Sequence, residues 1–141
     1  MKRRVAREKA LQTLFQMQVG KISAEEALEN VMEDATTEDK QDPFLLELVR
    51  ETAQHLEAID DIIKRYLRHF SIDRLANVDR AILRLGICEL LYIKEIPEKV
   101  TLNEMIELAK AFGDEDSRRF TNGVLSNVLR GKLEEEKGNE E

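Results

Sequence analysis

Apolar residues recur along most of this chain at intervals of three and four positions, the spacing of one face of an α-helix. The first stripe, Leu11, Leu14 and Phe15, predicts a helix over residues 3–19. Similar stripes predict a short helix after Ser23, helical residues 43–67, 77–93 and 101–113, and a last helix after residue 116. Because runs that alternate apolar and polar residues are missing from the sequence, we predict an all-α fold.

Signals for helix starts accompany several of these stripes. Ser23-Ala24-Glu25-Glu26 and Thr101-Leu102-Asn103-Glu104 each have the pattern of a capping box, with a hydroxyl at the N-cap and a glutamate three residues later. Pro43 follows Asp42 and suits the first position of a helix, where no amide hydrogen is needed. These signals predict helix starts at three places.

Signals for helix ends and breaks are equally local. Gly20 and Gly113 are expected to end the helices before them. Residues 34–42 are polar, acidic and without periodicity, so we interpret them as a mobile surface loop. The run over 43–67 is long enough to predict a kink or joint near Glu57, and Ser71-Ile72-Asp73 breaks the pattern again.

The segment 77–93 is apolar on nearly all sides, which indicates a buried central helix. Its polar exceptions are Asp79, Arg80 and Arg84, of which Arg80 and Arg84 share a face. Gly123 lies inside the last helical pattern, where we expect it to permit close packing against a neighbouring helix.

Composition agrees with one domain. A chain of 141 residues with 42% apolar residues can bury a core without a disulfide or a metal. We expect this domain to span residues 1–133, because residues 134–141 have the composition of a disordered acidic tail. Cys88 is the only cysteine, and no apolar stretch has the length of a membrane span or a signal peptide. These features predict a cytoplasmic protein that does not enter a membrane.

Charge is unevenly distributed along the chain. Residues 1–9 carry five basic side chains and one acidic one, a net charge of +4, whereas the whole chain carries −7. The remaining 132 residues therefore carry −11. A basic segment on an acidic protein suits an anionic partner, although a solubilising terminus is an equal alternative.

The sequence contains no pattern that predicts catalysis, a cofactor or a metal. It has no phosphate-binding loop or dinucleotide fingerprint. His55 and His69 are far apart, a single cysteine cannot complete a zinc site, and both histidines are expected to be partly exposed. Carboxylate pairs such as Asp60-Asp61 are most simply solvated helix faces, and no strained nucleophile turn accompanies them. We therefore expect no enzymatic activity.

The first helix has residue types that suit RNA. Arginine and lysine neutralise phosphates, and aromatic side chains stack on unpaired bases. The basic residues are Lys2, Arg3, Arg4, Arg7 and Lys9. Gln12 can hydrogen-bond a base edge, and Phe15 can stack on a base or else pack in the core. Alone this signal is weak, because many helices begin with basic residues.

Several segments, taken together, resemble the NusB family. They are Ala6–Gln16, Asn77–Leu85 with Glu89–Leu91, Ile96-Pro97 with Asn103–Lys110, and Phe120–Leu125. These segments keep the family's order and spacing across residues 3–130. The resemblance implies about seven helices in two packed subdomains. It also implies an antitermination factor that binds boxA RNA of ribosomal RNA leaders with NusE, a ribosomal protein, and joins RNA polymerase and other Nus factors.

The resemblance also implies roles for single residues. The basic RNA-binding arm would be Lys2, Arg3, Arg4 and Arg7, with Phe15 where the family often has tyrosine. The rim near the RNA would include Phe112, Asp116 and Phe120. Asp79 and Arg84 match central-helix positions linked to NusE, with an internal salt bridge that holds the fold as the alternative.

The chain departs from the family pattern at four positions. Val5 interrupts the usual arginine run, and Phe15 lacks a tyrosine hydroxyl, so one phosphate contact and one hydrogen bond would be missing. Phe70 stands where tryptophan is common, and Thr121 where valine is common. Two other interpretations stay open. One is a NusB-like domain of the kind fused to ribosomal RNA methyltransferases, although no cofactor-binding domain follows. The other is a helical adaptor that binds only protein.

Overall fold

The structure is a computed structural model that describes residues 1–67 and 71–140, with side chains described to residue 135. Its elements are α1 (Arg3–Gly20), α2 (Ala24–Val31), α3 (Thr37–Lys40), α4 (Pro43–Gln54), α5 (Leu56–Tyr66), the 3₁₀ turn η1 (Ile72–Arg74), α6 (Asn77–Tyr92), α7 (Glu98–Phe112) and α8 (Glu115–Glu140). The all-α prediction is confirmed. Seven of the helices in the described part of the chain have eight or more residues.

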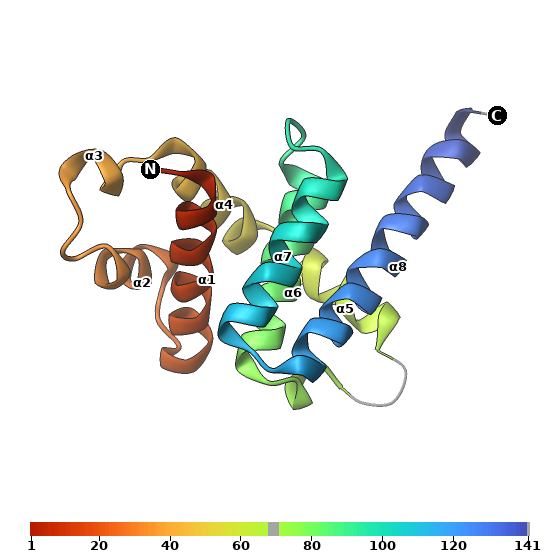
Figure 1. Ribbon diagram of the computed structural model, residues 1–141, viewed down its shortest axis with the longest axis horizontal. Coiled ribbons are helices and arrows are strands. Elements are labelled where there is room, and N and C mark those ends of the chain that lie inside the picture. Colours follow the sequence, from red (N-terminus) through yellow and green to blue (C-terminus); the bar gives the residue numbers. More distant parts are fainter. Residues whose placement is uncertain (68–70, 141) are drawn as a thin grey trace.

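The helices form two groups that meet at α6 (Figure 1). α1, α2 and α4 pack on one another at one side of the molecule, and α5, α7 and α8 gather at the other. α6 contacts α1 and α4 as well as α5, α7 and α8, so it belongs to the core of both groups. Its residues from Ala81 to Leu90 are buried except Arg84, as the apolar pattern predicted.

Several helix boundaries follow from the local signals. The Ser23 hydroxyl accepts a hydrogen bond from the Glu26 amide at 3.1 Å, and an Asp42 carboxylate oxygen accepts one from the Leu45 amide at 3.0 Å. Each bond satisfies one of the first-turn amides that a helix start leaves free. α1 includes Gly20 and ends there.

The expected joint in the long run over 43–67 is present. It lies at His55, between α4 and α5 and two residues before the expected position. The His55 ring stacks on the ring of Tyr92 with centroids 3.8 Å apart. This contact links the joint to the last residue of α6.

Two predictions about local structure were wrong. Residues 34–42 contain the helix α3, which begins where the Thr36 hydroxyl accepts from the Asp39 amide at 3.1 Å. A helix of four residues is too short to show a periodic stripe. α7 begins at Glu98 after Pro97, so Thr101 is not an N-cap. Instead Thr101 is buried, and its hydroxyl donates to a Glu89 carboxylate oxygen at 2.9 Å.

The expectation for Gly123 was also wrong. Gly123 is exposed, and a Cβ built there meets no atom of the described residues within 4 Å. Gly86 in α6 is the glycine at a close helix contact. A Cβ there would lie 2.9 Å from a Leu125 methyl carbon and 3.0 Å from Met105 Cγ. Gly86 therefore lets α6 approach α7 and α8.

The last helix extends beyond the body of the molecule (Figure 1). α8 runs to Glu140, so residues 134–140 are helical where composition predicted disorder. The separation of a tail from a domain over 1–133 stays a prediction. The expectations for His69 and Phe70 concern residues outside the described ranges. Within those ranges, no helix is both long enough and apolar enough to cross a membrane.

Candidate nucleic-acid interface

The five basic residues at positions 2–9 point to three different sides of the start of α1. Arg3 and Arg7 lie against Phe44 of α4. Arg4 reaches across to α7, where it meets Glu104. The remaining two, Lys2 and Lys9, line a hollow on a third side. The segment predicted as one basic arm therefore presents three different environments.

Arg7 is buried in the core. Its guanidinium forms a fork with the Glu89 carboxylate, with Nε 3.0 Å from Oε2 and Nη2 2.5 Å from Oε1. The two side chains are 4% and 0% exposed. The Thr101 hydroxyl adds a third donor to the same carboxylate. A buried charge needs such partners, so this trio joins α1, α6 and α7. The expectation that Arg7 contacts RNA phosphate does not fit this geometry.

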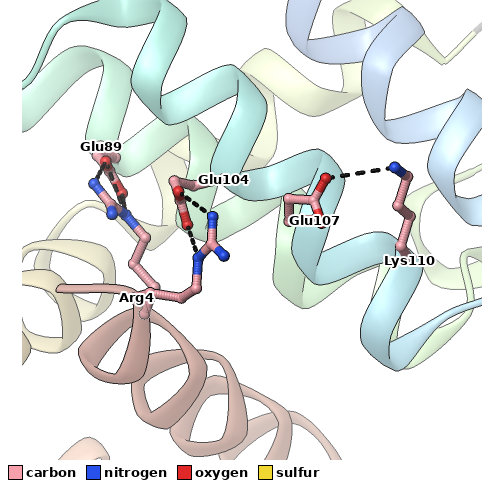
Figure 2. Close-up of polar contacts among 6 residues, drawn as sticks. Arg4, Glu89, Glu104, Glu107 and Lys110 are labelled. Atoms are coloured by element: carbon pink, nitrogen blue, oxygen red, sulfur yellow. Dashed lines mark hydrogen bonds and ion pairs between the residues drawn. The ribbon is translucent and has the colours of Figure 1, made fainter. Parts of the chain in front are cut away.

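Arg3 and Arg4 remain at the surface. The Arg3 guanidinium carbon lies 4.8 Å from the centre of the Phe44 ring, a cation–π distance. Arg4 forms a fork with Glu104, with nitrogen–oxygen distances of 2.9 and 3.1 Å (Figure 2). The hydrogen bond from Arg4 lowers the pKa of the Glu104 carboxyl below its ordinary value. Both arginines are exposed residues at the start of α1.

Lys2, Lys9 and Val5 form one wall of a hollow of about 470 Å³ between α1 and the chain from Asn30 to Ala35. The hollow also contains acidic side chains. Asp39, one of them, lies 3.8 Å from the terminal ammonium group. Cationic groups on this side therefore face both solvent and carboxylates.

Two exposed aromatic side chains share a hollow at the other end of α1. Phe15 is 36% exposed and Phe112, the last residue of α7, is 41% exposed. The hollow has a volume of about 420 Å³ and is lined by Leu11, Gln12, Phe15, Gln16, Val78 and Phe112. Phe15 is thus a surface residue rather than a core residue, and the amide of Gln12 borders the same space. The structure brings together three residues that the sequence analysis placed on the RNA side.

The start of α8 is acidic and capped by Asp114. One Asp114 carboxylate oxygen accepts from the Ser117 amide at 2.8 Å and from its hydroxyl at 3.1 Å. These bonds lower the pKa of Asp114. Asp116 lies in the first turn and is exposed, whereas Phe120 is partly buried against the core.

Arg84 and Asp79 have different surroundings. Arg84 donates to both Asp60 carboxylate oxygens, at 2.8 and 2.7 Å, and to the Gln18 side-chain oxygen at 3.0 Å. It therefore forms the internal salt bridge that was the alternative to NusE recognition. Asp79 is half-buried, and its Oδ1 atom accepts no hydrogen bond from any described residue.

Sequence reasoning missed the acidic partners of the arginines. Glu89 is the one acidic residue between Ala81 and Ile93, and a lone charge in so apolar a helix signals a buried partner. Glu104 was interpreted as part of a capping box, and nothing local connects it with Arg4. Among the described residues no group of three or more metal-ligating side chains comes together.

The sequence of this chain is similar to those of proteins from one known family. The NusB family model matches residues 4–130. The chain is 50% identical over 128 residues to the transcription antitermination protein NusB of Bacillus subtilis, covering 91% of this chain and 95% of the relative. It is 48% identical over 130 residues to the protein of the same name from Exiguobacterium sp., covering 92% and 98%.

Solved structures from the same family are similar to the fold of this chain. NusB of T. maritima is similar with a TM-score of 0.84 and 38% identity, covering 92% of both chains. A crystal structure of the antitermination factors NusB and NusE in complex with double-stranded RNA is similar with a TM-score of 0.81 and 31% identity, covering 92% of this chain and 96% of that chain.

Proposed function

This chain belongs to the NusB family, and from that premise we propose that it is a transcription antitermination factor that binds boxA RNA of ribosomal RNA leaders together with NusE. In this proposal the complex joins RNA polymerase and other Nus factors in the cytoplasm. The function is binding, and the protein catalyses no reaction. Support comes from the relatives named as antitermination proteins and from the similar structure that contains NusE and RNA.

The observation that carries the RNA site is the hollow that Phe15 and Phe112 share. Exposed apolar side chains that share one hollow often mark a binding surface, and every RNA base offers a flat face for stacking. Gln12 beside them can donate to or accept from a base edge. We assign this hollow to unpaired bases of the RNA, with Asp116 and Phe120 at its rim.

The phosphates would lie along the basic end of α1. Arg4 and Phe15 are eleven residues apart, or roughly 16 Å along a helix axis, so one short stretch of RNA can reach both. Lys2, Arg3 and Lys9 add further positive charge there, whereas Arg7 is occupied by Glu89. With about three phosphate contacts on single-stranded RNA, the slope of log affinity against log salt should be near −2.

NusE recognition is assigned to the start of α6. Asp79 is half-buried, and its charge lacks a full set of hydrogen-bond partners in the described chain, so a cationic or donor group of NusE next to this residue would be favourable. Replacing Asp79 with lysine should weaken NusE binding in a pull-down while the thermal midpoint moves by only a few degrees. A collapse of stability in this variant would instead make Asp79 a structural residue.

The test of RNA function is a titration of labelled boxA RNA and a scrambled RNA, each with and without NusE. We expect preference for boxA and tighter binding with NusE. Phe112→Ala should weaken boxA binding about fivefold to 150-fold, because stacking on one aromatic contributes about 1–3 kcal/mol. Val100→Ala is the matched control, an exposed apolar residue near the other end of α7. Equal binding of boxA and scrambled RNA under all conditions would contradict the proposal.

A further inference from the structure

Arg4, at the exposed start of α1, already holds an anion. Its Nε and Nη2 atoms both donate to the Glu104 carboxylate, which comes from the second turn of α7 (Figure 2). A carboxylate and a phosphate bind a guanidinium in the same two-bonded geometry. In the RNA-free protein, Glu104 therefore occupies the edge of Arg4 that a phosphate would use.

The surroundings of Arg4 are acidic. Besides Glu104, the charges of Glu107 and Glu8 act on its guanidinium. Lys110, a cation on the same helix as Glu104, lies 3.4 Å from Glu107 and is partly neutralised by it (Figure 2). A phosphate approaching Arg4 thus meets carboxylates that offset part of the positive charge of its guanidinium.

The Arg4–Glu104 pair can open, unlike the buried pair of Arg7 and Glu89. The Arg4 side chain is 62% exposed and that of Glu104 is 17% exposed, so water competes for the guanidinium more than for the carboxylate and weakens the pair. An RNA strand that brings its own phosphate can take the place of the carboxylate without disturbing the packing of α1 on α6.

We propose that Glu104 is an intramolecular competitor for RNA phosphate at Arg4, and that opening this ion pair is a step of RNA binding. The inference rests on the proposed RNA function and adds to it a residue that lowers affinity. Glu104 makes affinity for isolated RNA weaker than the basic segment would allow, so that binding depends more on the bases and on the partner protein.

The test compares boxA RNA binding by the parent, Glu104→Gln, Arg4→Gln and the double variant, without NusE. Glutamine keeps one acceptor for Arg4 but removes the charge. Two like charges about 7 Å apart in water change a binding constant about threefold, so Glu104→Gln should bind roughly threefold to tenfold tighter at about 50 mM salt. Because Arg4 is released for a phosphate, the salt slope should steepen by about 0.7.

The double variant tests whether Glu104 acts through Arg4. When Arg4 is glutamine, Glu104→Gln should bring at most the roughly threefold gain from relieved repulsion and leave the salt slope unchanged, because the release of a phosphate-binding arginine needs both partners. Glu29→Gln on α2 is the charge-matched control. Its RNA affinity should stay within about twofold of the parent, and its salt slope within about 0.3. Thermal midpoints of all variants check that the fold is kept.

The outcomes separate the two claims. If the parent prefers boxA RNA and Glu104→Gln binds no tighter, or binds tighter with an unchanged salt slope, the inference is overturned and the proposed function stands. A weaker Glu104→Gln variant would show that the carboxylate positions Arg4 for RNA, and that also overturns competition. If the parent shows no preference for boxA RNA either without or with NusE, the proposed function fails, and the inference fails with it.

Discussion

Replacing Arg7 with methionine should destabilise the protein and leave the salt dependence of RNA binding unchanged. Methionine keeps an unbranched apolar stem but is shorter and has no charge, so Glu89 would keep only the hydroxyl of Thr101 as a donor. Removing one partner of a fully buried ion pair costs about 3–5 kcal/mol, because the other charge stays buried without compensation. Since small domains are stable by about 5–15 kcal/mol, Arg7→Met is expected to remain folded but marginal.

A second substitution measures the pair itself. Changing Glu89 to methionine in the Arg7→Met protein removes the uncompensated charge, and apolar replacements of buried ion pairs are often neutral. The hydroxyl of Thr101 then lacks its acceptor, which costs about 1–3 kcal/mol. The double variant should therefore be more stable than Arg7→Met by roughly 1–3 kcal/mol, a clear departure from additivity.

Urea unfolding followed by circular dichroism gives these free energies, and RNA titrations at several salt concentrations give the slope. Arg3→Met is the matched control, since Arg3 is exposed above Phe44 at the same end of α1. This control should lose under about 1 kcal/mol of stability and flatten the salt slope by about 0.7. If Arg7→Met is as stable as the parent and flattens the slope instead, Arg7 contacts phosphate and the burial argument is refuted.

Three further predictions address packing, reactivity and pH. Gly123→Ala should stabilise the protein by about 0.5–1 kcal/mol through helix propensity. Gly86→Ala should destabilise it, because overpacking costs about 1–3 kcal/mol. Urea midpoints that shift in the same direction in both variants would contradict this contrast. Burial raises the pKa of the Cys88 thiol to about 12, so a disulfide reagent at pH 8 should label it only at the rate of unfolding, and rapid labelling of the folded protein would contradict its burial. The amide and hydroxyl of Ser117 lower the pKa of Asp114, so its cap stabilises α8 above the ordinary pKa and is lost as the pH falls through the lower folded value. Thermal midpoints should therefore fall less steeply below about pH 4 in Asp114→Ala than in the parent, and parallel curves would show that the cap contributes nothing.

What the sequence determined by itself is the seven longer helices in the described part of the chain and several of their ends, whereas the four residues of α3 escaped it. A helix depends on residues within about four positions, so stripes such as Leu11, Leu14 and Phe15 and caps such as Ser23 and Asp42 contain the information needed. The resemblance to the NusB family added the expected function and the candidate residues. The buried central helix was also predictable, because its composition leaves few polar positions for solvent.

Only the tertiary structure decided which charged residues are available to a ligand. Arg3, Arg4 and Arg7 look equivalent in the sequence. In the structure, Arg3 lies over the Phe44 ring, Arg4 forms an ion pair at the surface, and Arg7 forms a buried ion pair. The carboxylate that pairs with Arg4 lies 100 residues further along the chain, and the one that pairs with Arg7 lies 82 residues further along.

Helix packing was undetermined by the sequence for the same reason. Gly86 and Gly123 both lie in helical patterns, but only the docking of Leu125 and Met105 on α6 makes one of them necessary. Periodicity identifies the face of a helix that is buried, whereas the neighbour on that face depends on how all the helices fill one core, and a local pattern carries no record of that.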